Sequence, residues 1–260
     1  MAALSASPAP LAAAQLSVRA GTRELVRDLS AEFARSEMVA ILGRNGSGKT
    51  LTLHTLAGLR PAAAGEVALN GTPIGRLARR QVALRLGVLP QDLEDGFISS
   101  ALESVLIGRH PHLKLWQWES ADDERLAREA LAAVDLGEFA ARRTNTLSGG
   151  EQRRVAVASL LAQQPQVFLL DEPTNHLDPH HQLGVLRLFR ALSRSGRTVI
   201  TTLHDPTLAA RFADRVLLLF GDGRWSLGPM RDLSAAALSE LYLAPMIELN
   251  QDGRRVFVSA

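Results

Sequence analysis

Runs of apolar residues without polar interruptions are the clearest pattern along the chain. Met38–Leu42 and Val167–Leu170 are continuously apolar, and a third run, Thr198–Leu203, is rich in β-branched residues. A half-buried strand would alternate with polar residues, whereas a strand covered on both faces does not. The three runs therefore predict buried strands of a parallel sheet.

Longer stretches with apolar residues at helical spacing lie between and after these strands. Ser120–Val134 begins with a capping residue, carries acids in its first turn and is apolar on one side. Further helices are expected over Glu151–Ala162 and around Leu233–Leu243. Glycine-containing turns at 221–223 and 251–253, each beside a short strand, predict β-hairpins.

The order of these elements predicts an α/β fold. Residues near 15–90 and 165–220 are expected to form a mostly parallel sheet flanked by helices, with a small antiparallel β wing. Residues from about 91 to 164 are expected to form an inserted helical subdomain. The whole domain is expected to span 15–243, with 244–260 as a C-terminal strand extension of it.

The segment that follows the first buried strand has the composition of a phosphate-binding loop. Its glycines let the backbone fold around an anion with N–H groups pointing inward, and a helix starting near Lys49 adds the positive end of its dipole. In this pattern Lys49 reaches the β- and γ-phosphates and the Thr50 hydroxyl can ligate Mg²⁺. The segment reads Gly43, Arg44, Asn45, Gly46, Ser47, Gly48, Lys49 and Thr50.

Composition supports this interpretation through the basic residues. Of the 29 lysines and arginines only two are lysines, and Lys49 stands where a compact ammonium is needed. The formal charge of +2 does not indicate a nucleic-acid-binding surface. Without cysteine, and without an apolar run near ~18 residues, neither a disulfide framework nor a membrane span is expected. Residues 1–14, rich in Ala, Ser and Pro, lack the features of a secretion signal and are expected to form a disordered tail.

Two carboxylates end the second buried strand. Asp171 and Glu172 follow Val167–Leu170 directly, which places them at the carboxyl edge of the sheet, where ligand sites of α/β proteins lie. Adjacent side chains at a strand end point in different directions, so the two can do different jobs. The alternative for Glu172 is an ordinary acid at a helix start.

A second glycine-rich helix start lies before Glu151–Ala162. A capping Ser148 followed by two glycines leaves bare amides that are ready for another phosphate, whereas an ordinary cap would explain the serine alone. One chain cannot readily present both glycine elements to the same nucleotide. The segment consists of Leu147, Ser148, Gly149, Gly150, Glu151 and Gln152.

These segments, in this order, resemble the ATP-binding subunit of an ABC transporter, from about Leu16 to the C-terminus. The resemblance implies a P-loop NTPase fold of the RecA-like type and hydrolysis of ATP to ADP and phosphate. It implies that Asp171 holds the Mg²⁺ shell and that Glu172 orients and deprotonates the attacking water. It also implies that Gln91 contacts Mg²⁺ and water and that His204 touches the γ-phosphate.

The same resemblance implies the assembly. Two copies pair head to tail on binding ATP, so that the signature of residues 147–152 closes over the γ-phosphate on the other copy's loop of residues 43–50. Cofactors are ATP and Mg²⁺, the ion held by Thr50, Gln91 and Asp171. Partners are two integral-membrane permease subunits and a periplasmic binding protein, without nucleic acid, on the cytoplasmic face of the inner membrane. The dimer-coupling loop corresponds to Asn175, His176, Leu177 and Asp178.

One common feature of the family is missing. Members stack adenine on an aromatic residue upstream of the phosphate loop, and the matching position here is Ala20, with no aromatic nearby. Arg19 and Arg23 are the candidates to lie over the base instead, because guanidinium groups stack on π-faces.

Two groups of histidines and a pair of tryptophans have a plainer interpretation. The histidine spacings fit no zinc site, so side chains facing solvent are favoured over a metal site. Trp116 and Trp118 are interpreted as packing or docking residues. The histidine groups are His110 with His112, and His176 with His180 and His181.

Two functions remain for such a chain. One is the energising subunit of a membrane importer, and the other is a soluble ABC-type ATPase acting on a ribosome, DNA or an assembly complex. Soluble members usually carry two units in tandem, a long insertion or a coiled coil, which favours the importer. Val105–His112 and Arg255–Val258 resemble the branch that imports iron–siderophore, haem and vitamin B12, and Leu115–Glu119 inclines the choice toward cobalamin.

Overall fold

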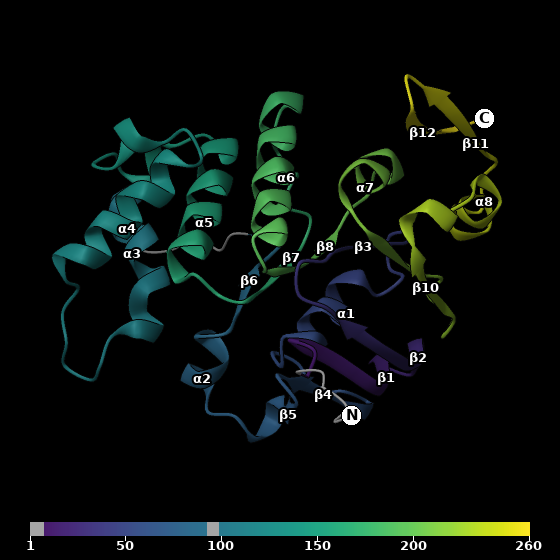
Figure 1. The fold of residues 1–260 in the computed structure, drawn as a ribbon, viewed down its shortest axis with the longest axis horizontal. Helices are drawn as coiled ribbons and strands as arrows, with labels where there is room; N and C mark the ends of the chain where they lie inside the picture. Colours follow the sequence, from purple (N-terminus) through teal and green to yellow (C-terminus); the bar gives the residue numbers. More distant parts are fainter. Residues whose placement is uncertain (1–7, 93–98) are drawn as a thin grey trace, which may run out of the picture.

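A six-stranded sheet forms the centre of the molecule in the computed structural model, which describes residues 8–92 and 99–260 (Figure 1). The strand order is β10-β9-β3-β8-β7-β6, and only the edge strand β10 is antiparallel to its neighbour. The three strands expected from the sequence are confirmed as neighbours. The bounds are β3 (Met38–Leu42), β6 (Leu86–Leu89), β7 (Val167–Leu170), β8 (Thr198–Thr202), β9 (Arg215–Leu219) and β10 (Trp225–Pro229).

Both faces of this sheet are covered, which explains its continuously apolar strands. Met38, Ala40 and Leu42 belong to a core shared with the helices that follow β6 in the sequence. Val39 and Ile41, which point to the opposite face, belong to a second core shared with the antiparallel sheet and the helix after β3. All five side chains are fully buried, so a polar residue at any of them would lose its contact with water.

The expected antiparallel wing is also present, as a separate four-stranded sheet in the order β2-β1-β4-β5. It packs on the face of the central sheet that carries Val39 and Ile41. The fold is therefore the predicted α/β arrangement with an antiparallel wing. The wing strands are β1 (Leu11–Ala20), β2 (Arg23–Phe33), β4 (Ala64–Leu69) and β5 (Thr72–Pro73).

The start of β1 corrects the expected tail of residues 1–14. Leu11 is fully buried and pairs with Phe33 and with Leu69, so Leu11–Ala14 belongs to the wing. Leu11 and Ala13 alternate inward as strand residues should, but the alanines on both sides obscure that period in the sequence. Residues 1–7 lie outside the described residues.

The helices between β6 and β7 gather at one side of the molecule, and the C-terminal hairpin lies at the opposite end (Figure 1). The helices between β6 and β7 are α3 (Ala101–Leu106), the 3₁₀ segment η2 (Ile107–His112), α4 (Ala121–Ala132) and α5 (Gly149–Gln163). The other helices are α1 (Lys49–Leu56), α2 (Arg79–Ala83), α6 (Pro179–Arg194), α7 (Pro206–Phe212) and α8 (Ala235–Tyr242), and the hairpin is β11 (Met246–Gln251) with β12 (Arg254–Ser259). No helix in the described part of the chain has the length and apolar character needed to cross a bilayer.

A buried ion pair fixes the start of α4. The Ser120 hydroxyl accepts a hydrogen bond from the N–H of Asp123 at 3.2 Å, as the sequence predicted for this cap. The Asp123 carboxylate accepts hydrogen bonds from the Ser120 hydroxyl at 2.6 Å and the Ser120 N–H at 3.0 Å, and it pairs with Arg109 at 2.8 Å. These bonds, first those from Ser120 and then that from Arg109, lower the pKa of Asp123 to about 2.

We expect Asp123→Asn to lower the free energy of unfolding by about 3 kcal/mol near neutral pH, because Arg109 would be left buried without its partner. The pKa of Asp123 is lower in the folded chain, so this contribution is present above about 3.8 and is lost as the pH falls toward about 2. Chemical denaturation at several pH values measures it.

The matched control is Asp122→Asn, which removes an exposed pair with Arg125 and should cost less than about 0.5 kcal/mol. An equal loss from both variants would contradict the role given to the buried pair.

Candidate functional site

The glycine-rich loop lies between the end of β3 and the start of α1. Gly46 and Gly48 have φ values of 74° and 99°, in the left-handed region that glycine adopts without strain. A Cβ atom on Gly43 would lie 2.4 Å from the Ser47 Oγ, so this turn also requires glycine. Gly48 is the cap residue of α1, which places the free N–H groups of the first helical turn at this loop.

Lys49 lies buried within that loop. Its Nζ donates hydrogen bonds to the carbonyl oxygens of Gly43 at 2.9 Å and Arg44 at 3.3 Å. Burial lowers the pKa of Lys49, and the negative charges of Glu172 and Asp171 oppose that shift. Within the described residues this ammonium donates hydrogen bonds to neutral carbonyls and to no carboxylate, so an oxyanion would give it a charged hydrogen-bond partner.

The carboxylates after β7 are held by a threonine on the neighbouring strand. The Thr202 hydroxyl donates to the Asp171 Oδ1 at 2.6 Å and accepts from the Glu172 N–H at 2.8 Å. Both acids are buried, but they point to different partners, as the sequence predicted. Glu172 has a φ of 48°, a left-handed value that is uncommon for a residue with a side chain and is often found at functional sites.

The Glu172 carboxylate contacts two other residues singled out from the sequence. Its Oε1 lies 2.5 Å from the Nε2 of His204, and its Oε2 accepts a hydrogen bond from the Asn175 side chain. The Glu172 side chain is 6% exposed, whereas that of His204 is 46% exposed. The buried carboxylate of Glu172 therefore contacts a partly exposed histidine, His204, which follows the end of β8.

A cleft of about 400 Å³ brings the phosphate loop, Glu172 and His204 together. Gln91 lies at its edge, where its Oε1 is 3.4 Å from the Thr50 Oγ1. The cleft contains predicted residues from four separate segments of the chain. Its lining is Ala20, Leu25, Asn45, Gly46, Gly48, Lys49, Thr50, Leu51, Gln91, Glu172 and His204.

The second glycine element does not line this cleft. Ser148 caps α5 by accepting from the Glu151 N–H at 3.3 Å, and the Glu151 carboxylate accepts from the Ser148 N–H at 2.7 Å. A Cβ atom on Gly150 would lie 3.2 Å from the carbonyl oxygen of His176, so the signature lies beside the 175–178 loop. As predicted, one chain does not bring both glycine elements to one pocket.

Comparisons with known proteins agree with this geometry. The sequence profile of the ABC transporter family matches residues 26–175. The hemin import ATP-binding protein HmuV of Streptomyces coelicolor is 41% identical over 241 residues, which cover 90% of this chain and 84% of that protein. The chain belongs to the ABC transporter family. Its HmuV relative from Thermobifida fusca is 37% identical, over 89% of this chain and 81% of that protein.

Solved structures of ABC proteins share the fold over nearly the whole chain. A chain from an inward-facing metal-chelate type ABC transporter has a TM-score of 0.84 and 27% identity, covering 96% of this chain and 97% of that one. A dimeric ATP-binding cassette in a post-hydrolysis state, bound to ADP and phosphate, has a TM-score of 0.75 and 27% identity, covering 86% and 100%. The protein is therefore an ATPase of the ABC transporter family with the predicted P-loop NTPase fold.

The structure reveals a residue of this ABC site that the sequence reasoning missed. Arg153 of α5 is 2% exposed, and its guanidinium donates to the carbonyl oxygens of Asp171 at 2.6 Å, Glu172 at 2.9 Å and Gln91 at 3.1 Å. Burial lowers the pKa of Arg153 to about 10. The helix that begins with residues 149–150 is thereby bonded to the backbone of Gln91, Asp171 and Glu172. The sequence offered one signal for this burial: Arg153 lies on the same face of the helix as the apolar Val157, one turn further on.

The residues expected to hold Mg²⁺ in an ABC site fit that ion. The Asp171 Oδ2 is buried and accepts no hydrogen bond from the described residues. Thr50 and Gln91 present their oxygens to each other at 3.4 Å. Mg²⁺ prefers oxygen ligands, often one carboxylate together with substrate phosphates, so this donor set suits it.

The histidine groups do not form a metal site. Among residues 8–92 and 99–260, no three side chains of His, Cys, Asp or Glu are grouped so that they could share an ion. His110, His176 and His180 are exposed, as expected, whereas His112 and His181 are half-buried. His112 lies 2.9 Å from the carbonyl oxygen of Gln163 through its Nε2, so it has a structural partner.

Neither arginine considered as a substitute for the adenine-stacking aromatic lines the cleft. Arg19 donates to the Glu24 carboxylate at 3.2 Å, and Arg23 donates to the Gly221 carbonyl oxygen at 2.7 Å. Ala20 does line the cleft, so its position is the one expected for the base. The described residues therefore offer a methyl group there, without a π-face.

We expect GTP to compete with ATP within about tenfold, because the absent stacking removes on the order of 1–3 kcal/mol of contact with the base. Displacement of a fluorescent ATP analogue from the purified protein measures both affinities. Ala20→Tyr is the control and should tighten both nucleotides. A preference for ATP well beyond a hundredfold would show that another group recognises adenine.

Proposed function

We propose that this chain is the ATP-hydrolysing subunit of an importer and that the importer takes up haem. The observation that carries the proposal is the 41% identity with a hemin import ATP-binding protein over 84% of that protein's length. The TM-score of 0.84 with a metal-chelate type transporter supports the same branch of the family. The relatives' names favour haem among the three chelates considered from the sequence, and they do not support the inclination toward cobalamin.

The active unit in this proposal is a homodimer. The cleft around Lys49 lacks the signature of its own chain, and Ser148 with its two glycines lies on the 175–178 side of the molecule. A second copy placed head to tail would bring those amides to the open side of the cleft. The dimeric post-hydrolysis cassette, at 27% identity, supports this arrangement.

Within each composite site, the residues of this chain have separate tasks. The loop amides and Lys49 hold the β- and γ-phosphates, and the amides of residues 148–150 from the other copy cover the γ-phosphate. Mg²⁺, when held by Thr50, Gln91 and Asp171, supplies positive charge to the phosphate oxygens. None of these three tasks removes a proton from the attacking water.

Glu172 is the base that receives the proton. As the water oxygen bonds to the γ-phosphorus and the bond to the bridging oxygen breaks, the carboxylate takes the water's proton. Each of its oxygens has two acceptor positions, so the contacts with His204 and Asn175 leave room for water. His204, exposed at the mouth of the cleft, donates to the γ-phosphate as charge develops.

The remaining partners are two permease subunits in the cytoplasmic membrane and a periplasmic binding protein. In this proposal the chain lies peripherally on the cytoplasmic face, bound to the permease subunits. Permease helices would dock beside Gln91, between the sheet and the helices of residues 99–164. Movement there can be transmitted to the segment after β7 through Arg153, which donates to the carbonyl oxygens of both Gln91 and Asp171.

Uptake by reconstituted vesicles tests the proposal. The chain, with its cognate permease and binding protein, is expected to drive ATP-dependent accumulation of haem, and the same complex carrying Glu172→Gln should not. Uptake of cobalamin or a ferric siderophore without haem would overturn the assigned cargo. Absence of uptake for all three chelates would overturn the importer.

A further inference from the structure

Three large apolar side chains stand almost fully in solvent on the connection between η2 and α4. Leu115, Trp116 and Trp118 are 87%, 92% and 86% exposed. The packing role considered from the sequence is therefore wrong within this chain, and docking is the interpretation that remains. We call residues 113–119 the tryptophan loop. It extends at the lower left of Figure 1, away from the C-terminal hairpin.

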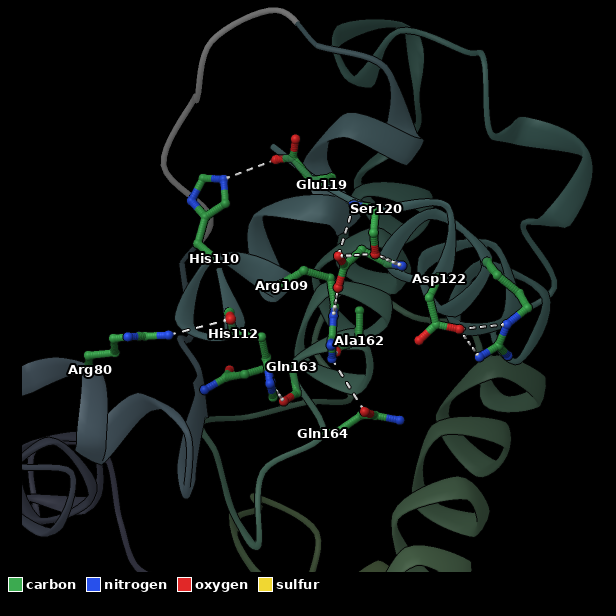
Figure 2. Close-up of polar contacts among 12 residues, drawn as sticks. Arg80, Arg109, His110, His112, Glu119, Ser120, Asp122, Ala162, Gln163 and Gln164 are labelled. Carbon is green, nitrogen blue, oxygen red and sulfur yellow. Dashed lines mark hydrogen bonds and ion pairs between the residues drawn. The ribbon is translucent and has the colours of Figure 1, made fainter. Parts of the chain in front are cut away.

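The base of the tryptophan loop is held by buried polar contacts. Arg109, just before it, pairs with Asp123, just after it, and donates to the Ala162 carbonyl oxygen at 2.8 Å. Figure 2 shows Arg109 between Ser120, which follows the loop, and Gln164 at the end of α5. Such a base fixes where the loop points, because both its ends are joined to α4 and α5.

A second set of contacts surrounds that base. His110 and Glu119 face each other across the loop at 3.7 Å, and Arg80 of α2 donates to the His112 carbonyl oxygen at 3.4 Å (Figure 2). Arg80 also donates to the Pro111 carbonyl oxygen at 2.8 Å. His112 contacts the Gln163 carbonyl oxygen at 2.9 Å. The loop is consequently joined to the central-sheet side of the molecule as well as to the helices.

The tip of the loop has an unusual backbone that directs its rings outward. The Gln117 N–H donates to the Lys114 carbonyl oxygen at 3.0 Å, and the Gln117 side chain accepts from the Lys114 N–H at 3.0 Å. Within this turn Trp116 has a φ of 64°, which is a strained value for a bulky residue. Strain of this kind, together with two unpacked indoles, is typical of a binding surface.

The geometry points to the lipid headgroup region of a bilayer as the partner of the tryptophan loop. The apolar residues stand at a projecting tip, which suits insertion into a soft medium. Tryptophan is enriched at membrane interfaces because its ring is apolar and its N–H is polar. The inference rests on the proposed placement at a membrane, and it adds the segment that touches lipid.

Charge around the loop supports an anionic lipid surface. Lys114 is exposed beside the tip, and Arg79 and Arg80 lie exposed on the neighbouring α2. The one acid in the loop, Glu119, faces His110, and the exposed acids that follow on α4, Asp122 and Glu124, pair with Arg125 and Arg128. Each basic side chain close to an anionic leaflet adds attraction that reaches about one Debye length, so the cations reinforce insertion of the rings.

Vesicle binding by the full chain tests this inference. We expect the parent protein to bind vesicles containing phosphatidylglycerol, and brominated lipid to quench its tryptophan fluorescence. Trp116→Ala with Trp118→Ala should weaken partitioning by at least about tenfold. Lys114→Gln should weaken it about fivefold on phosphatidylglycerol vesicles and leave binding to phosphatidylcholine unchanged.

The control is Trp225→Phe, since Trp225 is half-buried and donates to the Arg27 carbonyl oxygen at 2.8 Å. That variant and the double tryptophan variant should keep the basal ATPase rate of the parent. Absence of quenching by brominated lipid would overturn the inference. The inference would also be overturned if the indoles became buried only when detergent-solubilised permease was added, or only when the protein associated with itself. Haem uptake by the reconstituted importer could survive each of these outcomes, so the two proposals fail separately.

Discussion

Replacing Glu172 by glutamine is expected to lower ATP hydrolysis by at least about a hundredfold while leaving Mg-ATP binding close to that of the parent. The amide keeps the shape of the side chain and can still contact Asn175 or His204, but it cannot accept the proton of the attacking water. The loop around Lys49 is untouched. The variant should therefore accumulate as an ATP-bound dimer.

Phosphate release measures hydrolysis, and sedimentation with ATP measures the dimer. Glu240→Gln is the matched control, because Glu240 is an exposed acid paired with Arg224 outside the cleft, and it should hydrolyse ATP at the parent rate. Near-normal turnover by Glu172→Gln would remove Glu172 from the role of base. Loss of ATP binding would instead assign it a structural role in the cleft.

The features predicted well from the sequence are those in which one physical requirement dominates. Burial on both faces leaves no choice but apolar residues in β3 and β7, and tight anion binding needs glycine at Gly46 and Gly48. The edge position of Asp171 and Glu172 followed from the direction of β7. These are local requirements, and the sequence expresses them directly.

The features that were missed depend on contacts between distant segments. Arg153 resembles any arginine of a helix until β6 and β7 bring the carbonyl groups of Gln91 and Asp171 around it. Leu11 could be recognised as a strand residue only through its partners Phe33 and Leu69. The exposure of Trp116 depends equally on tertiary structure, because the sequence alone allowed packing as well as docking.

The central claim is that each site combines the phosphate loop of one copy with the signature of another. Two variants separate these halves. Lys49→Ala removes the ammonium of the loop and leaves Ser148 intact, whereas Ser148→Arg places a bulky cation on the signature and leaves Lys49 intact. Each variant alone is expected to lose at least about a hundredfold in hydrolysis, because every site in its dimers lacks one half.

The most direct measurement is the ATPase rate of the two variants mixed in equal amounts, on membranes that carry the cognate permease. Half of the dimers would then contain both variants, and each of those would have one site with an intact Lys49 and an intact Ser148. The account predicts recovery to about one quarter of the parent rate. A mixture no more active than either variant alone would contradict the shared site.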